Sequence, residues 1–576
     1  AKANNKYLKD AYNPRKSSSY ILYLDANDLC GYAMSQSLPY DEFTWITEEE
    51  CQTIDWLAQT DDQPYGYFVE CDLHYPDDLD DLHDDYPLAP ERIVVEDHLL
   101  SEKQDALRSQ YAISHTATSK LVPNFFDKKK MLIHYRNLRF YLQHGLVVTK
   151  MHRGIRFRQS KWLELYIRTN TEMRALAKDP VEVKLRKDMN NIIYGKTCEN
   201  LTKRTDIKLV NTQKECDKLT SKPQCLRFQI FADELAGVEL QKVKCVINKP
   251  TYVGFAVLEL SKLRMYEFHY NHFKQWYPDA DLLFTDTDSL VYHIFTDDLY
   301  ADLAAHREEF DFSGYPNAHT LFGVDNKMVV GKMKDESGGH IITEFVGLRP
   351  KMYSYLTKPD DDDDDDAEPK ESKRAKGIQR AAMTDIRHAD YLAQLKRGRE
   401  NYVNVRRIGQ KHHRVFTIEG MKRGLCAFDD KRYLLADGIH TMAHGHCAIR
   451  LEQTRDFDEP IPESPLTTSF SPWVEDEGNA DVSGFLTVSH ADATHMGMRP
   501  HITQDEVVAM VGGANLRHEI DSMSTVNTVR ATSAVPHRRR NIVDDGDTNV
   551  DDDANDVDEL LNLLDVAMST GMNEPY

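Results

Sequence analysis

Two aspartates separated by one residue lie in the stretch from Phe284 to Ser289, which reads Phe-Thr-Asp-Thr-Asp-Ser. Apolar, β-rich runs precede and follow this polar corner, a pattern that predicts a hairpin. Side chains at i and i+2 share one face of an extended chain, so Asp286 and Asp288 would repel each other unless a cation neutralised them. Mg²⁺ prefers such hard oxygen ligands, although most acidic hairpin corners are solvated turns.

Three further sets of residues could complete a reaction centre: a strand-end carboxylate, a helix face and a basic-aromatic stretch. They are Asp25 after a strand predicted over 20–25; Lys187, Asn191 and Tyr194, spaced i, i+4 and i+7 in a helix predicted over 181–199 and followed by Gly195; and Lys351 with Tyr353. Phosphoryl transfer onto a 3′-hydroxyl would use all of them. Two metal ions need carboxylates from two adjacent strands, here Asp25 and Asp288, and Lys187 can meet a triphosphate.

The elements that must position these residues are a strand over 20–25, the hairpin, and two helices. The helix over 181–199 carries the cationic face, and a strand or turn within 251–270 leads into a helix whose apolar residues pack beneath the hairpin. Residues 120–185 are expected to be basic and largely helical, and 200–250 to alternate short strands with polar turns. Aromatic residues within the acidic stretch 41–105 predict a folded segment there.

Length and composition indicate several domains in a chain of 576 residues. No apolar run approaches a membrane span, so no membrane partner is expected. Nine cysteines without a Cys-x-x-Cys pair indicate a reducing compartment, and hence an intracellular protein, nuclear in a eukaryotic host. His440, His444, His446 and Cys447 offer zinc-ligand types, but ordinary structure is the favoured interpretation of that segment.

The net charge of −23 is distributed unevenly. Residues 451–576 hold 25 acidic and 7 basic side chains, which predicts an acidic, disordered tail. Residues 120–208 hold 21 basic and 8 acidic side chains, the density that a phosphate-binding surface needs, although a solvated basic helix face is the alternative. The acidic run at 360–366 is predicted to be a surface loop.

The order of these motifs resembles family B DNA polymerases. Asp-x-x-x-Leu from Asp25, Lys-x-x-x-Asn-x-x-Tyr-Gly from Lys187, Asp-Thr-Asp-Ser from Asp286 and Lys-x-Tyr from Lys351 are similar to motifs A, B, C and Lys-x-Tyr. The wording Leu-Asp-Ala-Asn at 24–27, Ala-Met-Ser-Gln at 33–36, Tyr-Gly-Lys-Thr at 194–197 and Asp-Gly-Ile-His at 437–440 is closer to the protein-primed branch, especially Polinton (Maverick) transposon and related viral polymerases. The resemblance covers about residues 20–446.

The resemblance implies an α+β right-hand fold with a mixed-sheet palm, helical fingers and a thumb. It divides the chain into the start of the palm with motif A (1–40), an insertion like the first terminal-protein region (41–120), basic helical fingers with motif B (121–199), an insertion like the second terminal-protein region (200–250), the palm with motif C (251–346), the Lys-x-Tyr motif and thumb (347–450), and the tail (451–576). The two terminal-protein regions rest on position alone.

The resemblance also implies roles for single residues. Asp25, Asp288 and the carbonyl of Ala26 would hold two Mg²⁺ ions, with Mn²⁺ able to substitute, and Asp286 would support them. Lys187 would contact the triphosphate. The remaining roles are a nucleotide pocket shaped by Cys30, Asn191 and Tyr194, template approach at Gly195, and a primer end held by Lys351 and Tyr353. The implied partners are a DNA primer-template, deoxynucleoside triphosphates and a terminal protein.

Two departures from the family pattern bear on function. Cys30 stands where the family carries an aromatic ring under the sugar, which predicts weaker exclusion of ribonucleotides. Asp28 adds a carboxylate near the metals and is expected to weaken triphosphate binding. The family's exonuclease motifs precede motif A, and fewer than 25 residues precede it here, so no proofreading is expected of this chain. The alternatives to a DNA polymerase are an inactive relic that binds nucleic acid and a reverse transcriptase.

Overall fold

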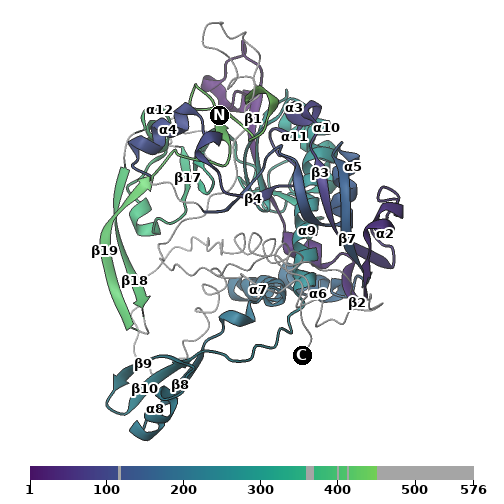
Figure 1. The fold of residues 1–576 in the computed structure, drawn as a ribbon. Helices are drawn as coiled ribbons and strands as arrows, with labels where there is room; N and C mark the ends of the chain where they lie inside the picture. The colour runs from purple at the N-terminus through teal and green to yellow at the C-terminus, as the bar shows by residue number, and fades with distance from the viewer. Residues whose placement is uncertain (114–117, 359–368, 399–400, 412–413, 450–576) are drawn as a thin grey trace. The chain divides into compact units, whose positions relative to one another are not determined.

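The computed structural model describes residues 1–113, 118–358, 369–398, 401–411 and 414–449. These residues divide into two compact units, one of 1–192 with 256–449 and one of 193–255, and each is described by itself. The acidic loop at 360–366 and the tail at 451–576 lie outside the described residues. Both units combine helices and strands, so the mixed α and β composition is confirmed (Figure 1).

An eight-stranded sheet forms the centre of the larger unit. Its main order is β11 (Asp281–Asp286), β12 (Ser289–Phe295), β1 (Ser19–Ala26), β15 (Ile342–Arg349), β16 (Met352–Thr357) and β17 (Lys370–Ala375), with β14 (Met333–Asp335) on β1 and β13 (Phe310–Asp311) on β14. All pairs are antiparallel except β13 with β14. The predicted strand at 20–25 and the predicted hairpin are therefore confirmed, and they are neighbours in this sheet.

The two faces of this sheet bury different halves of each strand, because neighbouring side chains point to opposite faces. One face packs on α9 (Thr251–Tyr266) and the π-helical turn Glu267–Phe273, as predicted for the helix beneath the hairpin. The buried residues on this face are Tyr20, Leu22, Leu24, Leu290, Tyr292 and Ile294 from the strands, and Met265, Phe268 and Phe273 from the helical segment. The other face buries Ile21, Leu283, Phe284, Val291, Phe345 and Tyr353.

A second sheet has the order β2 (Leu38–Ile46), β7 (Val147–Ser160), β3 (Tyr65–His74) and β6 (Lys128–His134), all antiparallel. The prediction of a largely helical stretch over 120–185 is wrong for β6 and β7. The sequence carries the reason, since Ile155, Phe157 and Gln159 are buried while Arg156 and Arg158 point outward, an alternation with the period of a strand. The sheet joins strands from both sides of residue 120.

The helices of the larger unit follow the sequence in short segments. They are α1 (Leu29–Met34), α2 (Glu48–Thr53), α3 (Asp80–His83), α4 (Glu102–Gln110), α5 (Tyr135–Gln143), α6 (Glu164–Leu176), the first part of α7 (Pro180–Thr197), α10 (Lys274–Trp276), α11 (Leu299–Ala305) and α12 (His388–Arg397). Three strand pairs complete it: β4 (Glu91–Ile93) with β5 (Lys120–Val122), β18 (Asn401–Lys411) with β19 (Arg414–Leu425), and β20 (Tyr433–Leu434) with β21 (Thr441–Met442). None of the described helices is long and apolar enough to cross a membrane.

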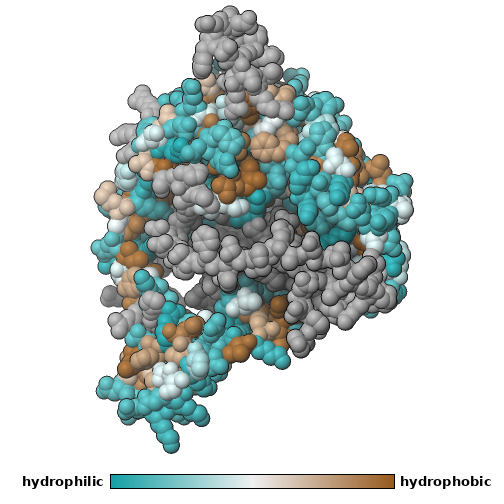
Figure 2. Space-filling view, in the orientation of Figure 1, coloured by the Kyte–Doolittle hydropathy of each residue, from teal (hydrophilic) through white to brown (hydrophobic). Residues whose placement is uncertain are grey.

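The smaller unit contains a three-stranded antiparallel sheet of order β8 (Asp206–Val210), β10 (Leu235–Leu240) and β9 (Cys225–Ala232), with α8 (Gln213–Thr220). The strands were predicted, whereas α8 was not. Val210, Ala236, Val238 and Leu240 form its small core. Apolar side chains also remain on its surface (Figure 2), among them Leu209, Phe228 and Ile230.

Candidate active site

The end of β1 and the turn of the hairpin bring Asp25 and Asp288 together. Asp25 is in register with Ser289 of β12, and the Ala26 amide donates to the Asp288 carbonyl at 2.7 Å. The two-residue turn depends on a left-handed Thr287 (φ 51°), and the Asp288 amide donates to the Asp286 carbonyl at 2.6 Å. The backbone therefore fixes two carboxylate-bearing residues on neighbouring strands, as a site for metal ions requires.

The charges around Asp25 show what this arrangement lacks. Burial raises the pKa of Asp25 well above its usual value, and the carboxylates of Asp288 and Glu336 raise it further. Lys334 and Lys187 act in the opposite direction on the pKa of Asp25 without cancelling these effects. Oxygen-only donors with uncompensated negative charge fit Mg²⁺ or Mn²⁺, which would favour the ionised carboxylates.

The other aspartate of the hairpin faces a lysine. The Asp286 carboxylate lies 3.5 Å from the Lys351 ammonium, which follows β15 with a left-handed backbone (φ 56°). The ring of Tyr353 packs on Phe284 with centroids 4.8 Å apart, and its hydroxyl lies 2.9 Å from that of Tyr23. The structure thus joins the Lys-x-Tyr residues to the hairpin, with Lys351 at its polar corner and Tyr353 buried beneath it.

The turn after β1 is held by Asp28. Its backbone is left-handed (φ 44°), its Oδ1 accepts from the Gly31 amide at 3.2 Å, and so it caps α1. Its Oδ2 accepts from the side-chain amide of Asn190 on α7 at 2.8 Å, and Asn190 in turn accepts from Asn170 on α6 at 3.1 Å. The Asp28 carboxylate is therefore committed to two donors, which gives it a structural role that the sequence did not reveal. Cys30 lies half-buried in the first turn of α1.

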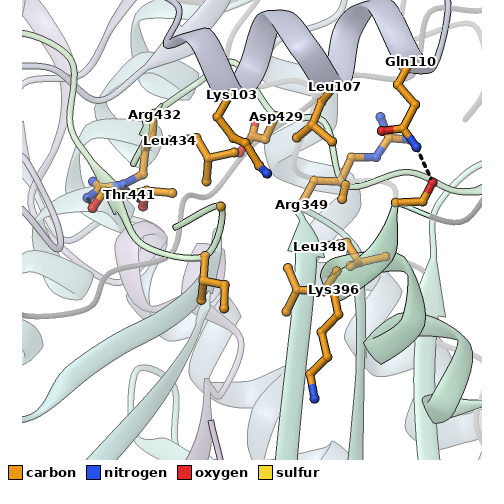
Figure 3. A pocket seen from close by; sticks show the side chains of 15 residues that line it. Lys103, Leu107, Gln110, Leu348, Arg349, Lys396, Asp429, Arg432, Leu434 and Thr441 are labelled. Carbon is orange, nitrogen blue, oxygen red and sulfur yellow. Dashed lines mark hydrogen bonds between the residues drawn. The ribbon is translucent and has the colours of Figure 1, made fainter. Parts of the chain in front are cut away.

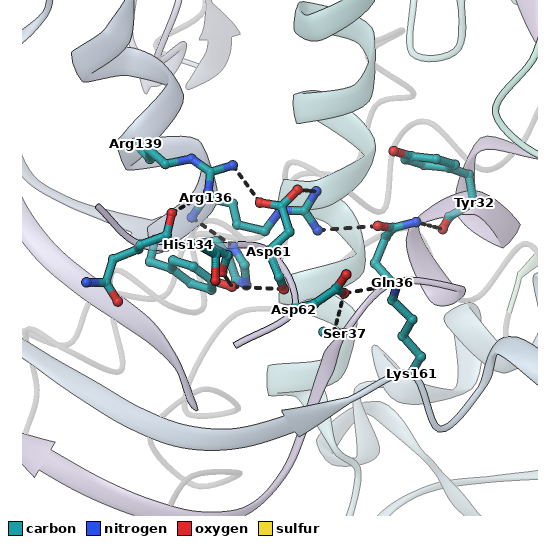
Figure 4. A network of polar contacts seen from close by, with 12 residues as sticks. Tyr32, Gln36, Ser37, Asp61, Asp62, His134, Arg136, Arg139 and Lys161 are labelled. Atoms are coloured by element: carbon teal, nitrogen blue, oxygen red, sulfur yellow. Dashed lines mark hydrogen bonds and ion pairs between the residues drawn. The ribbon is translucent and has the colours of Figure 1, made fainter. Parts of the chain in front are cut away.

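A polar network fixes the far end of α1 (Figure 4). Asp61 pairs with Arg136 at 2.9 Å and with Arg139 at 2.5 Å, both on α5. Arg136 donates to the Gln36 side chain at 3.4 Å, and Gln36 donates to the Tyr32 carbonyl at 3.3 Å. Because Arg136 is buried and Asp61 is partly exposed, this network links the second sheet's helix to the segment that follows the catalytic strand.

The α7 helix confirms the helix predicted over 181–199 and carries its four expected residues on two sides of the unit boundary. Lys187 and Asn191 belong to the larger unit, where Lys187 lies close enough to lower the pKa of Asp25. Tyr194 and Gly195 belong to the smaller unit, where Tyr194 is 4% exposed. A Cβ at Gly195 would meet no atom within 4 Å among the described residues, so the surface there is open to a close approach.

Sequence reasoning missed Lys334 and Glu336, which belong to the surroundings of Asp25. Lys334 is in register with Asp25 across β14, and its ammonium lies 2.8 Å from Glu336. The Glu336 amide donates to the Tyr23 carbonyl at 2.9 Å. No motif marks them; the charged run before Gly338 is the one local signal in the sequence.

A separate cavity of about 190 Å³ lies among α4, α12 and the segment 427–441 (Figure 3). Its lining includes the cationic Lys103, Arg349 and Lys396 together with leucines. The one acidic side chain among its lining residues is Asp429. The cavity therefore offers a positively charged, partly apolar hollow.

Comparison with known proteins finds similar solved structures only. No protein-family model and no curated protein matches the chain. Phi29 DNA polymerase complexed with primer-template DNA is 14% identical with a TM-score of 0.41, over 71% of this chain and 59% of that chain. The ternary complex of phi29 DNA polymerase with primer-template DNA and incoming nucleotides is 15% identical with a TM-score of 0.43, over 72% and 60%. The chain spans about three fifths of the polymerase chains it matches, and at these values its function has to be argued from the site.

Proposed function

We propose that the chain is the core of a DNA-directed DNA polymerase that adds deoxynucleotides to a primer 3′-hydroxyl. The observation that carries this proposal is the pair Asp25 and Asp288, placed on adjacent strands by the Ala26 to Asp288 backbone contact, with the charge of Lys187 acting on it. Carboxylates on two strands beside a helix-borne lysine are the parts that phosphoryl transfer from a triphosphate needs.

Each residue of the site has a part in the proposed reaction. Asp25 and Asp288, with the Ala26 carbonyl, would hold two Mg²⁺ or Mn²⁺ ions, which when bound favour the ionised 3′-hydroxyl and neutralise charge on the triphosphate. Lys187 binds the triphosphate as a fixed cation. Asp286 holds Lys351 at the corner of the hairpin, where the lysine can meet a primer phosphate.

The nucleotide and primer pockets are proposed around this centre. Cys30, Asn191 and Tyr194 would line the nucleotide pocket, and the open surface at Gly195 would admit the template. Tyr353 would act on the primer end by supporting the hairpin from below, since its ring is buried against Phe284.

The parts of a right-hand polymerase are assigned on the same basis. The eight-stranded sheet would be the palm, α6 and α7 the fingers, and the ribbon of β18 and β19 the thumb. Residues 41–120 and 200–250 would be the two regions that contact a terminal protein and assist strand displacement. Membership of the protein-primed branch of family B, and a role in replicating a mobile element or virus, belong to this proposal.

A primer-extension assay tests the proposal directly. The full chain is given a labelled DNA primer-template, the four deoxynucleotides and Mg²⁺, and extension is expected. Asp288→Asn should abolish it because the amide cannot replace an ionised ligand, whereas Asp279→Asn, an exposed aspartate just before β11, should not change it.

Three outcomes would contradict the proposal or redirect it. Absence of extension by a folded wild type would favour the inactive relic that binds nucleic acid. Extension on an RNA template in preference to DNA would favour a reverse transcriptase. Equal extension by wild type and Asp288→Asn would place the chemistry elsewhere in the protein.

A further inference from the structure

Three side chains of metal-ligand type meet at a place separate from the aspartate pair. Asp80 of α3, His446 and Cys447 each offer a ligand atom, and these atoms all lie within 4.8 Å of one another. Asp80 is 1% exposed and His446 3%, while Cys447 is half-buried. The sequence places Asp80 far from the other two, so the fold alone creates this cluster.

The Asp80 carboxylate is incompletely satisfied among the described residues. Its Oδ2 accepts from the Cys447 amide at 2.7 Å, whereas its buried Oδ1 has no hydrogen-bond partner in the part of the chain that the structure describes. A buried carboxylate oxygen without a donor is costly unless a cation or proton meets it. A bound cation would remove this cost.

The orientation of His446 favours the same conclusion. Its Nδ1 faces the Cys447 sulfur at 3.8 Å, and its Nε2 lies 3.3 Å from the exposed Asp81 carboxylate. A metal-ligating histidine usually donates its other ring N–H to a carboxylate in this way, which leaves the facing nitrogen with a lone pair for the metal. The Ala448 amide donates to Nδ1 at 3.1 Å, and a metal ion would replace that contact.

The neighbouring histidines have other partners. His440 contacts the Asp437 carboxylate, and His444 contacts the Asp430 carbonyl at 2.8 Å. Of the four zinc-ligand types noted at 440–447, the fold therefore selects His446 and Cys447 and adds Asp80.

We infer that Asp80, His446 and Cys447 form a zinc-binding site, with Asp81 orienting His446 and water completing the coordination. Oxygen, nitrogen and sulfur donors together suit Zn²⁺ and do not suit Mg²⁺, which takes oxygen ligands. Binding replaces the thiol proton of Cys447, which passes to solvent, by a metal–thiolate bond. The ion would link two segments whose sequence positions differ by 367.

Cobalt binding to the full chain tests this site. Co²⁺ stands in for zinc, and excess Mg²⁺ is present so that oxygen-only sites are occupied. Wild type should bind one equivalent and show a near-ultraviolet thiolate-to-cobalt band. Cys447→Ser should lose the band, Cys245→Ser should keep it as the matched cysteine control, and Asp81→Asn should weaken binding about 10–100-fold. A wild type without the band, or a Cys447→Ser protein that keeps it, would overturn the inference.

A second measurement uses the unmodified sequence, so it does not depend on a variant that folds. Alkylation of each cysteine by iodoacetamide is followed by mass spectrometry with and without Zn²⁺, with Cys216, Cys225 and Cys245 as internal references of intermediate exposure. Zinc should slow the modification of Cys447 and leave the references unchanged. Equal rates with and without zinc, or equal slowing of all four thiols, would contradict the site.

Discussion

Replacing Asp28 by alanine distinguishes a structural role for this residue from an electrostatic one. The sequence alone suggested that its charge weakens triphosphate binding. The structure instead shows its carboxylate capping α1 through Gly31 and accepting from the buried side-chain amide of Asn190. We therefore expect Asp28→Ala to destabilise the protein and to raise, not lower, the KM for deoxynucleotides, because the turn beside Asp25 loses its support.

The magnitude follows from the two lost contacts. Removing an N-cap costs about 1 kcal/mol, with a range of about 0.5–2. Leaving the buried Asn190 amide without this acceptor costs about 1–3 kcal/mol. Asp28→Ala should therefore lower the free energy of unfolding by about 2–4 kcal/mol. Thr47→Ala is the matched control, since Thr47 caps α2 on the surface and its loss should cost only about 1 kcal/mol.

Equilibrium unfolding in urea, compared at unchanged m values, measures these differences. A double-mutant cycle of Asp28→Ala with Asn190→Ala should give a coupling energy of about 1–2 kcal/mol, because the two side chains share one hydrogen bond. The structural reasoning would be refuted if Asp28→Ala kept the wild-type urea midpoint and lowered the KM for deoxynucleotides. That result would restore the electrostatic interpretation.

Two further predictions concern selectivity and pH. Cys30→Tyr should strengthen the exclusion of ribonucleotides, because a ring would fill the space under the sugar; equal ribonucleotide incorporation by both proteins would contradict this. Burial raises the pKa of Asp85 to about 7, a shift that Lys274 opposes and Asp84 reinforces. The folded protein then holds this proton between pH about 4 and 7 while the unfolded chain has released it, so stability falls as pH rises through that window, by up to about 4 kcal/mol. Asp85→Asn should remove this slope in urea midpoints taken at several pH values, and parallel wild-type and variant profiles would exclude Asp85 as its source.

The local elements near the site could be predicted because their signals are local. The apolar runs around Phe284 to Ser289 and the strand before Asp25 have the composition of strands, and the helix carrying Lys187 has a continuous 3.6-residue pattern. The failure at β6 and β7 has the opposite cause. Their basic and aromatic composition was interpreted as helical, although Ile155 and Phe157 alternate with arginines in the period of a strand.

The partners of the site residues came only from tertiary structure. Asp25 and Asp288 are about 260 positions apart, and they meet because β1 pairs with β12. Hydrogen bonds and charges act through space, so no linear motif announced Asn190 at Asp28 or Glu336 near Asp25.

The sequence by itself determined which side chains can do chemistry and which local element carries each of them, because residue type and periodicity are written along the chain. The tertiary structure decided which of these side chains act together. It placed Asp288 beside Asp25, committed Asp28 to a cap and buried Tyr353 under the hairpin. Strand pairing and packing between distant segments made those choices, since each depends on contacts that sequence spacing does not encode.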